Sequence, residues 1–186
     1  MKLTANFDRD EFGDVPQQYE GNVVALASLL QRFRDLAGVP FVIQPGGRVY
    51  SSPEHNATIF GAASNSQHLT ASAADGAFVG ITNRELARRV LAAMKDGTLP
   101  TFGQFILYDY NLHTHISLPR ATRNNEVLYA RKDSNGDPYY TPITSASDVP
   151  LVSAVTKKAA TGAASALGIM LLSLALSHAF GGPANG

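Results

Sequence analysis

Apolar residues that recur every three or four positions predict two amphipathic helices in the first hundred residues. The first covers residues 20–37, where seven apolar side chains keep this spacing, and Gly38 is placed to end it. The second begins at Thr82, which is followed three positions later by Glu85, a pair typical of a helix N-terminus. It runs to about Lys95.

Shorter apolar runs predict strands at residues 40–43, 73–79, 101–108 and 114–118. The last two strands are joined by a tight turn. Because alternate side chains of a strand face opposite sides, His115 and Ser117 share one face, and His113 joins them if the strand begins early. Residues 51–74 are polar, with little periodicity, and predict a long loop of the kind that is usually functional.

These elements predict an α+β fold, with a small, mostly antiparallel sheet, two packed helices and a functional site at the open edge of the sheet. The predicted domain covers residues 1–120. Residues 121–156 are polar and rich in Asn, Gly and Pro, and they predict a linker, in which the apolar residues 127–130 are a candidate short strand. Residues 157–181 predict a C-terminal hydrophobic helix.

The centre of this last segment, residues 159–180, contains no charged residue. Its 22 residues are enough to cross roughly 30 Å of hydrocarbon, so a transmembrane helix is predicted. The alternative is a helix buried against another subunit. Ala160, Ala164 and Gly168 lie four positions apart, a spacing that lets two such helices approach closely and self-associate.

Charge and composition narrow the partners and the chemistry. Among the 186 residues, 15 basic and 15 acidic side chains cancel, so no strong field attracts nucleic acid. The chain has no cysteine, so any metal must bind to His, Asp or Glu. Residues 1–8 carry charged side chains and no continuous apolar run, which is unlike a standard secretory signal.

Two short segments carry residues that bind metals. One holds His68 and, seven positions later, Asp75; the other holds His113 and His115. Two imidazoles and one carboxylate form the ligand set of a catalytic zinc site, in which a fourth position stays open for water. His68, Asp75 and His115 can supply this set, so the sequence predicts a small zinc hydrolase.

The same segments resemble a known family. Ser66-x-His68-x-x-Ala71-x-Ala73-x-Asp75 resembles the Ser-x-His-x-x-Gly-x-Ala-x-Asp signature of the D-alanyl-D-alanine carboxypeptidase and L-alanyl-D-glutamate endopeptidase family. His115-Ile116-Ser117 and Gln104-Phe105-Ile106 are similar to two further segments of that family, and Pro45-Gly46-Gly47-Arg48 stands where it has Ser-Gly-Tyr-Arg. The resemblance spans residues 5–119. It implies a fold related to the hedgehog and lysostaphin metal sites.

The resemblance also implies roles for individual residues. It implies that Zn²⁺ is bound by His68, Asp75 and His115. It further implies that Arg48 holds a carbonyl or carboxylate group of the substrate, a task suited to a planar guanidinium, while Ser66 and Gln67 line the substrate groove. Substrates of the family are peptide bonds in the stem peptide of bacterial peptidoglycan.

The sequence departs from the family pattern at the general base. Many members carry Glu three residues before the last zinc ligand, where this chain has Leu112, and phage-type members often carry Glu at the position of Tyr108. Asp109 is one position away from Tyr108 and is the favoured substitute, with His113 as the other candidate. The signature glycine is Ala71, which matters only if its backbone needs positive φ.

We therefore expect a zinc-dependent peptidoglycan peptidase of the endolysin or D,D-carboxypeptidase type. The alternative is a catalytically degenerate zinc-binding domain that serves as a cell-wall-binding or structural virion module. The hydrophobic segment adds an expectation of membrane association, in a phage virion or in the host cell envelope.

Overall fold

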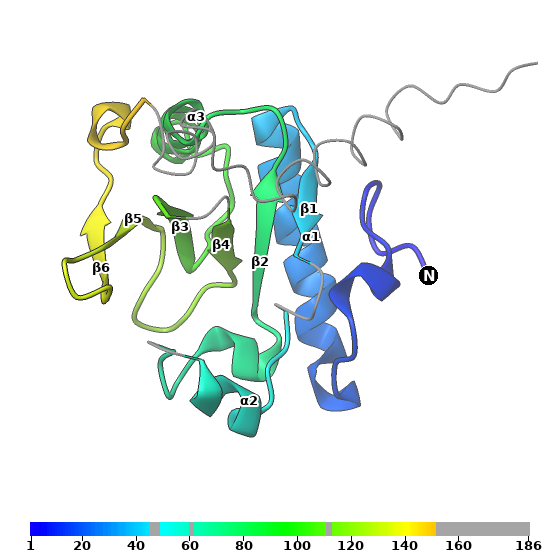
Figure 1. Ribbon diagram of the computed structural model, residues 1–186. Helices are drawn as coiled ribbons and strands as arrows, with labels where there is room; N and C mark the ends of the chain where they lie inside the picture. Colours follow the sequence, from blue (N-terminus) through cyan, green and yellow to red (C-terminus); the bar gives the residue numbers. More distant parts are fainter. Residues whose placement is uncertain (45–48, 60–61, 111–112, 152–186) are drawn as a thin grey trace, which may run out of the picture.

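The computed structural model describes residues 1–44, 49–59, 62–110 and 113–151, and within them six strands form a single sheet. Figure 1 shows this sheet, whose strand order is β1-β2-β4-β3-β5-β6. The strands are β1 (Phe41–Ile43), β2 (Ala73–Phe78), β3 (Gln104–Tyr108), β4 (Thr114–Ser117), β5 (Glu126–Lys132) and β6 (Pro138–Pro142). Four of the neighbouring pairs are antiparallel, and β3 with β5 is parallel, so the sheet is mixed.

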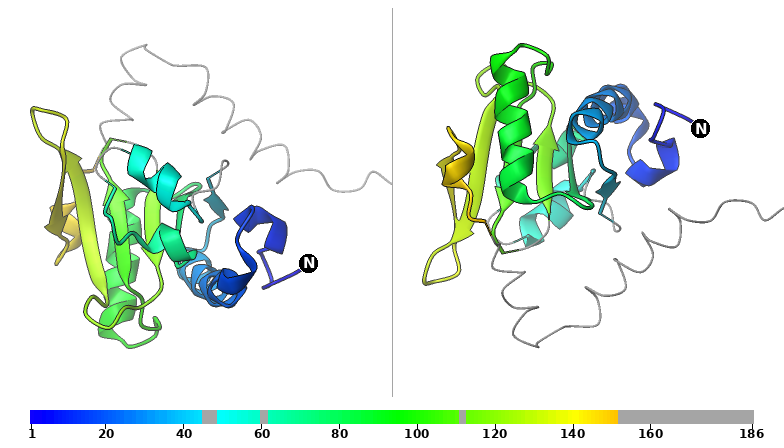
Figure 2. Two further views of the ribbon diagram at one scale, coloured as in Figure 1. Left: turned by 90° about the horizontal axis from the view of Figure 1, so that it is seen from below. Right: turned by 90° about the horizontal axis from the view of Figure 1, so that it is seen from above.

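In the described part of the chain, this sheet is combined with a few separate helices, so the fold is α+β, as expected. The α-helices are α1 (Glu20–Ala37), α2 (Pro53–Thr58) and α3 (Asn83–Lys95), and four short 3₁₀ segments cover Arg9–Phe12, Gln17–Tyr19, Gln67–Thr70 and Ala146–Asp148. Figure 2 shows α1 and α3 on one side of the sheet and α2 on the opposite side. The sheet therefore has one face that packs on two long helices and another that is only partly covered.

Both predicted amphipathic helices are confirmed. The apolar face of α1 is buried, and the Phe33 ring stacks on Phe105 of β3 with 5.3 Å between the ring centroids. Gly38 has a φ of 65° and ends α1 as expected. Thr82 caps α3 by accepting a hydrogen bond from the backbone N–H of Glu85, at 3.2 Å.

Two expectations about chain organisation are corrected by the sheet. Strands β5 and β6 lie inside residues 121–156, the segment predicted to be a linker, and they extend the sheet by two strands. Buried Val127 and Tyr129 anchor β5, but its apolar run covers only residues 127–130, between the charged residues Glu126 and Arg131, so the signal is weak. The predicted loop at residues 51–74 also contains α2 and a 3₁₀ turn.

The predicted hydrophobic helix at residues 157–181 lies outside the described residues, as does the uncharged run at residues 159–180 with its expected self-association. None of the helices in the described part of the chain has both the length and the apolar character needed to cross a membrane.

A close backbone approach in β2 gives a test of the packing. A Cβ atom at Gly76 would lie 2.4 Å from Cζ of Phe41 and 2.5 Å from the backbone oxygen of Val42. We expect Gly76→Ala to destabilise the protein by about 1–3 kcal/mol, because the β1–β2 pair must move apart to admit the methyl group. Thermal or urea unfolding measures the change.

The matched control for this substitution is Gly21→Ala in α1, where nothing lies within 4 Å of the added methyl group. Alanine is the better helix former, so this variant should be as stable as the parent protein or slightly more stable. Equal stability of the two variants would contradict the described β1–β2 packing.

Candidate metal centre

Strands β2 and β4 bring two of the predicted zinc ligands together. In this antiparallel pair, Asp75 lies directly opposite His115. Their neighbours Ala74 and Ile116, which are also paired, point into the hydrophobic core under the helices. By alternation, Asp75 and His115 face the other side of the sheet. Strands β2 and β4 are the second and third strands of the sheet, so the site lies on the face of the sheet. The expectation of a site at the open edge of the sheet is therefore corrected.

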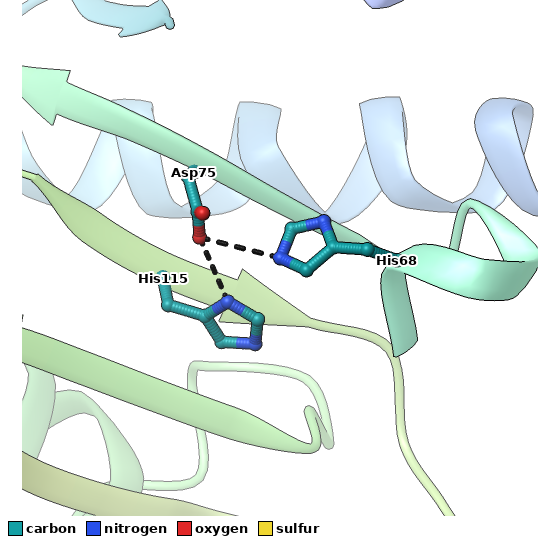
Figure 3. Close-up of side chains that lie close together, drawn as sticks. All are labelled: His68, Asp75 and His115. Atoms are coloured by element: carbon teal, nitrogen blue, oxygen red, sulfur yellow. Dashed lines mark hydrogen bonds and ion pairs between the residues drawn. The ribbon is translucent and has the colours of Figure 1, made fainter. Parts of the chain in front are cut away.

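The third predicted ligand comes from the 3₁₀ turn that precedes β2. Figure 3 shows His68 reaching from this turn toward the carboxylate of Asp75, with His115 beside it. Oδ1 of Asp75 lies 3.4 Å from Nε2 of His68 and 2.9 Å from Nδ1 of His115. Each of the three residues offers a ligand atom within 4.8 Å of the other two, and all three residues are buried.

These distances fit a zinc ion. Zinc bonds of about 2.0–2.2 Å in tetrahedral geometry place any two ligand atoms about 3.4 Å apart. The three side chains therefore need only small adjustments to surround one ion. The donor set also fits, because neutral imidazole nitrogens and a carboxylate oxygen are typical zinc ligands.

The backbone around His68 fixes how its ring is presented. Nδ1 of His68 lies 3.2 Å from the backbone oxygen of Val49, which can only accept a hydrogen bond. Nδ1 therefore carries the proton, and Nε2 is left with the lone pair that a metal requires. The Ser66 hydroxyl caps the turn by accepting from the His68 backbone N–H, at 3.3 Å.

Ala71 ends this turn in a left-handed conformation, with a φ of 51°. Its backbone N–H donates to the backbone oxygens of Gln67 and His68. The glycine of the family signature thus stands at a position that uses positive φ, and alanine accepts some strain there. The turn that carries His68 nevertheless ends in the left-handed conformation that a glycine would adopt at this position.

Electrostatics keep the carboxylate ionised. Burial alone would raise the pKa of Asp75, but the hydrogen bond with His115 and the nearby ring of His68 hold this pKa well below its usual value. Asp75 is only 6% exposed. A buried, ionised carboxylate between two imidazole rings favours the binding of a cation.

The three residues line a cavity of about 740 Å³, which is large enough for a short peptide. Ser66 and Gln67, the predicted substrate-binding residues, line the same cavity, and so does His113, one of the two candidate bases. The structure thus brings most of the predicted site residues together. Arg48 lies outside the described residues.

Asp109, the favoured candidate base, is placed elsewhere. Its Oδ1 accepts a hydrogen bond of 2.7 Å from the hydroxyl of Tyr129, which is 1% exposed and belongs to the hydrophobic core. Asp109 does not contribute to the lining of the cavity. Between the two candidates, the geometry favours His113, and the role of the base stays a prediction.

Several further polar residues line the cavity and were not identified from the sequence. They are Ser51, Gln104, Tyr108, Tyr110, Arg120, Arg123, Glu126 and Tyr140. Alternation along β3 could have identified Gln104 and Tyr108, because they share a face with Ile106, which lies opposite His115. The residues after position 119 could not be identified, because long-range contacts, such as the pairing of β5 with β3 and the contact of Arg120 with Asn65, bring them to the site.

Two of these tyrosines stay protonated close to the metal ligands. Burial, followed by the negative charge of Asp75, raises the pKa of Tyr140. The pKa of Tyr110 is raised by burial and by the charges of Tyr140 and Asp75. Neutral phenol groups can donate hydrogen bonds to a ligand in the cavity.

Comparison with known proteins agrees with this site. The family model described as Peptidase M15 matches residues 4–117, which is more than half of the chain, and the chain belongs to this family. Peptidases of this family are zinc-dependent, and the group formed by His68, Asp75 and His115 can hold the ion. The matched region ends with β4, so β5 and β6 lie beyond it. A search of curated proteins found no match.

The ligand set gives a direct prediction. His68→Ala removes one imidazole from the group, and we expect zinc bound to the purified protein to fall from about one ion per chain to near zero, as three ligands are needed for a stable catalytic site. Elemental analysis by mass spectrometry measures this stoichiometry.

His55→Ala is the matched control, because His55 is exposed on α2 and belongs to no metal-binding group in the described residues. This variant should keep its zinc. If His68→Ala retains a full equivalent, or if both variants lose the metal equally, His68 is not a ligand.

Proposed function

We propose that this protein is a zinc-dependent peptidase that cleaves stem peptides of bacterial peptidoglycan. The observation that carries the proposal is the convergence of His68, Asp75 and His115 in a cavity of a chain that belongs to the Peptidase M15 family. The cell-wall substrate is supported by the resemblance of the signature at residues 66–75 to the carboxypeptidase and endopeptidase family named above.

The residues of the chain divide the work of hydrolysis. His68, Asp75 and His115 would hold the zinc ion, which supplies Lewis acidity and activates water for attack on a peptide carbonyl. Asp75 stays ionised because both imidazoles lower its pKa against the effect of burial. His113 lines the cavity and is the side chain that we assign to accept a proton during the reaction.

A second candidate function is a zinc-binding module that binds peptide without cutting it. It is favoured because the acidic residues that line the cavity already have other partners. In the described part of the chain these residues are Asp75 and Glu126. Asp75 is assigned to the metal, and Glu126 accepts a hydrogen bond from the side-chain amide of Gln104, at 2.8 Å. Residue 112, where many relatives carry Glu, is Leu. A general base contributes about 10²–10⁴-fold in rate, so a domain without one would be very slow.

Digestion of peptidoglycan separates the two candidates. We expect the full chain, loaded with zinc, to release peptide fragments from purified peptidoglycan, identified by mass spectrometry, and His68→Ala to release none. Zinc-loaded protein that binds peptidoglycan without releasing fragments would contradict the peptidase and support the binding module.

The same assay assigns the base. His113→Gln should lower the rate at least about 10²-fold, because it removes the proton acceptor from the cavity. Asp109→Asn should cost stability of about 1 kcal/mol through its bond to Tyr129, with little change in rate. The opposite pattern of rates would assign the base to Asp109.

We also propose that residues 159–180 attach the protein to a membrane, in a phage virion or a bacterial envelope. The support is the uncharged run itself, which is long enough to span the hydrocarbon layer. The full chain should then need detergent to stay soluble, and removal of residues 157–186 should abolish that need. A full chain that stays soluble without detergent would contradict this attachment.

A further inference from the structure

We propose that one end of the cavity, formed by Gln67, Arg120 and Arg123, binds an acylated amino acid through its amide N–H and its carboxylate. This inference rests on the proposed peptidase function and names the part of the substrate that the site recognises. Arg120 and Arg123 follow the region matched by the family model, and their role comes from the structure of this chain.

Gln67 supplies an acceptor that lacks a partner. The side chain is 6% exposed and lines the cavity. Its Nε2 donates to the backbone oxygen of Leu118, at 2.8 Å, which settles the orientation of the amide. Its Oε1 is buried and has no hydrogen-bond partner among the described residues. A buried oxygen of this kind is costly unless a ligand donates to it, and the N–H of a peptide bond is the matching donor.

Arg120 and Arg123 supply positive charge to the same cavity. Nη2 of Arg120 donates to the backbone oxygen of Asn65, at 3.0 Å. This contact holds the guanidinium next to the segment that carries Gln67, which in turn is bound to Leu118, two residues before Arg120. The two segments therefore hold Gln67 and Arg120 close together.

The charges at this end are not balanced. Burial lowers the pKa of Arg120, the positive charge of Arg123 lowers it further, and Glu126 partly opposes both effects. Neither arginine forms an ion pair with a carboxylate in the part of the chain that the structure describes. Two guanidinium groups that line one cavity favour an anionic ligand, and a guanidinium group can bind a carboxylate through paired hydrogen bonds.

An acceptor for N–H beside two donors for a carboxylate is complementary to an N-acyl amino acid. A stem peptide offers this chemistry in two places. One is its C-terminal D-alanine, and the other is a γ-linked D-glutamate, whose α-carboxylate is free inside the chain. The first would direct cleavage to the end of the peptide, and the second to its interior.

Binding of small probes tests the inference without relying on cleavage. Dissociation constants for the zinc-loaded full chain are measured by nuclear magnetic resonance titration with N-acetyl-D-alanine, N-acetyl-D-alanine amide and O-acetyl-D-lactate. We expect the first probe to bind about tenfold more tightly than each of the others. The amide lacks the carboxylate, and the lactate presents an ester oxygen to Gln67 where the amide N–H would be.

Protein variants show whether the arginines read the carboxylate. Arg123→Gln should weaken N-acetyl-D-alanine about tenfold and leave its amide unchanged, because one charge-assisted contact is lost. Arg32→Gln removes an exposed arginine from α1 and should change neither constant. This comparison also separates the arginines from direct binding of the carboxylate to zinc, which Arg123→Gln would not affect.

The inference is overturned if the acid does not bind, if acid and amide bind equally, or if Arg123→Gln behaves like Arg32→Gln. A fourth probe, N-acetyl-D-glutamic acid γ-methylamide, identifies the source of the carboxylate. Tighter binding of this probe assigns the internal glutamate, and tighter binding of N-acetyl-D-alanine assigns the chain end. Failure of the proposed function shows in a different measurement, as absent zinc or absent fragments, so the two failures are distinguishable.

Discussion

The register between β2 and β4 is the constraint on which the metal centre depends. It places Asp75 opposite His115, and it places Ala74 opposite Ile116. A shift of one residue in either strand would move a ligand into the hydrophobic core and an apolar side chain into the cavity. The core under α1 and α3 opposes such a shift, because burial of Ala74 and Ile116 stabilises only the observed register.

The remaining parts of the site are attached to this pair by short, specific contacts. The turn that carries His68 is connected directly to β2, and the backbone oxygen of Val49 sets the protonation of the ring. Strand β3 packs Phe105 against Phe33 on the helix side while Gln104 and Tyr108 line the cavity on the other side. The sheet thus separates a hydrophobic layer that supplies stability from a polar face that supplies chemistry.

Local patterns predicted the parts of the structure that are set by local physics. The 3.6-residue periodicity predicted both long helices, and the residue types of His68, Asp75 and His115, together with the family resemblance, predicted the metal-binding group. A short apolar run at residues 127–130 indicated part of β5, but β6 was missed, and the parallel pairing of β5 with β3 connects residues about twenty positions apart, which no local pattern predicts. The same pairing brings Glu126 to the cavity, and Arg120 and Arg123 reach it from the connection between β4 and β5. Asp109 shows a second limit of prediction from sequence. It directly follows the last residue of β3, and a difference of one position there decides whether a side chain faces the cavity or the core.

X-ray absorption at the zinc edge of the full chain is the most direct test of the central claim, which is that His68, Asp75 and His115 bind one zinc ion. We expect four or five nitrogen and oxygen neighbours at about 2.0–2.2 Å, with the multiple-scattering signal of two imidazole rings. In His115→Ala, zinc should be lost or the signal should fall to one ring. A coordination shell of oxygen atoms alone, without imidazole scattering, would contradict the account.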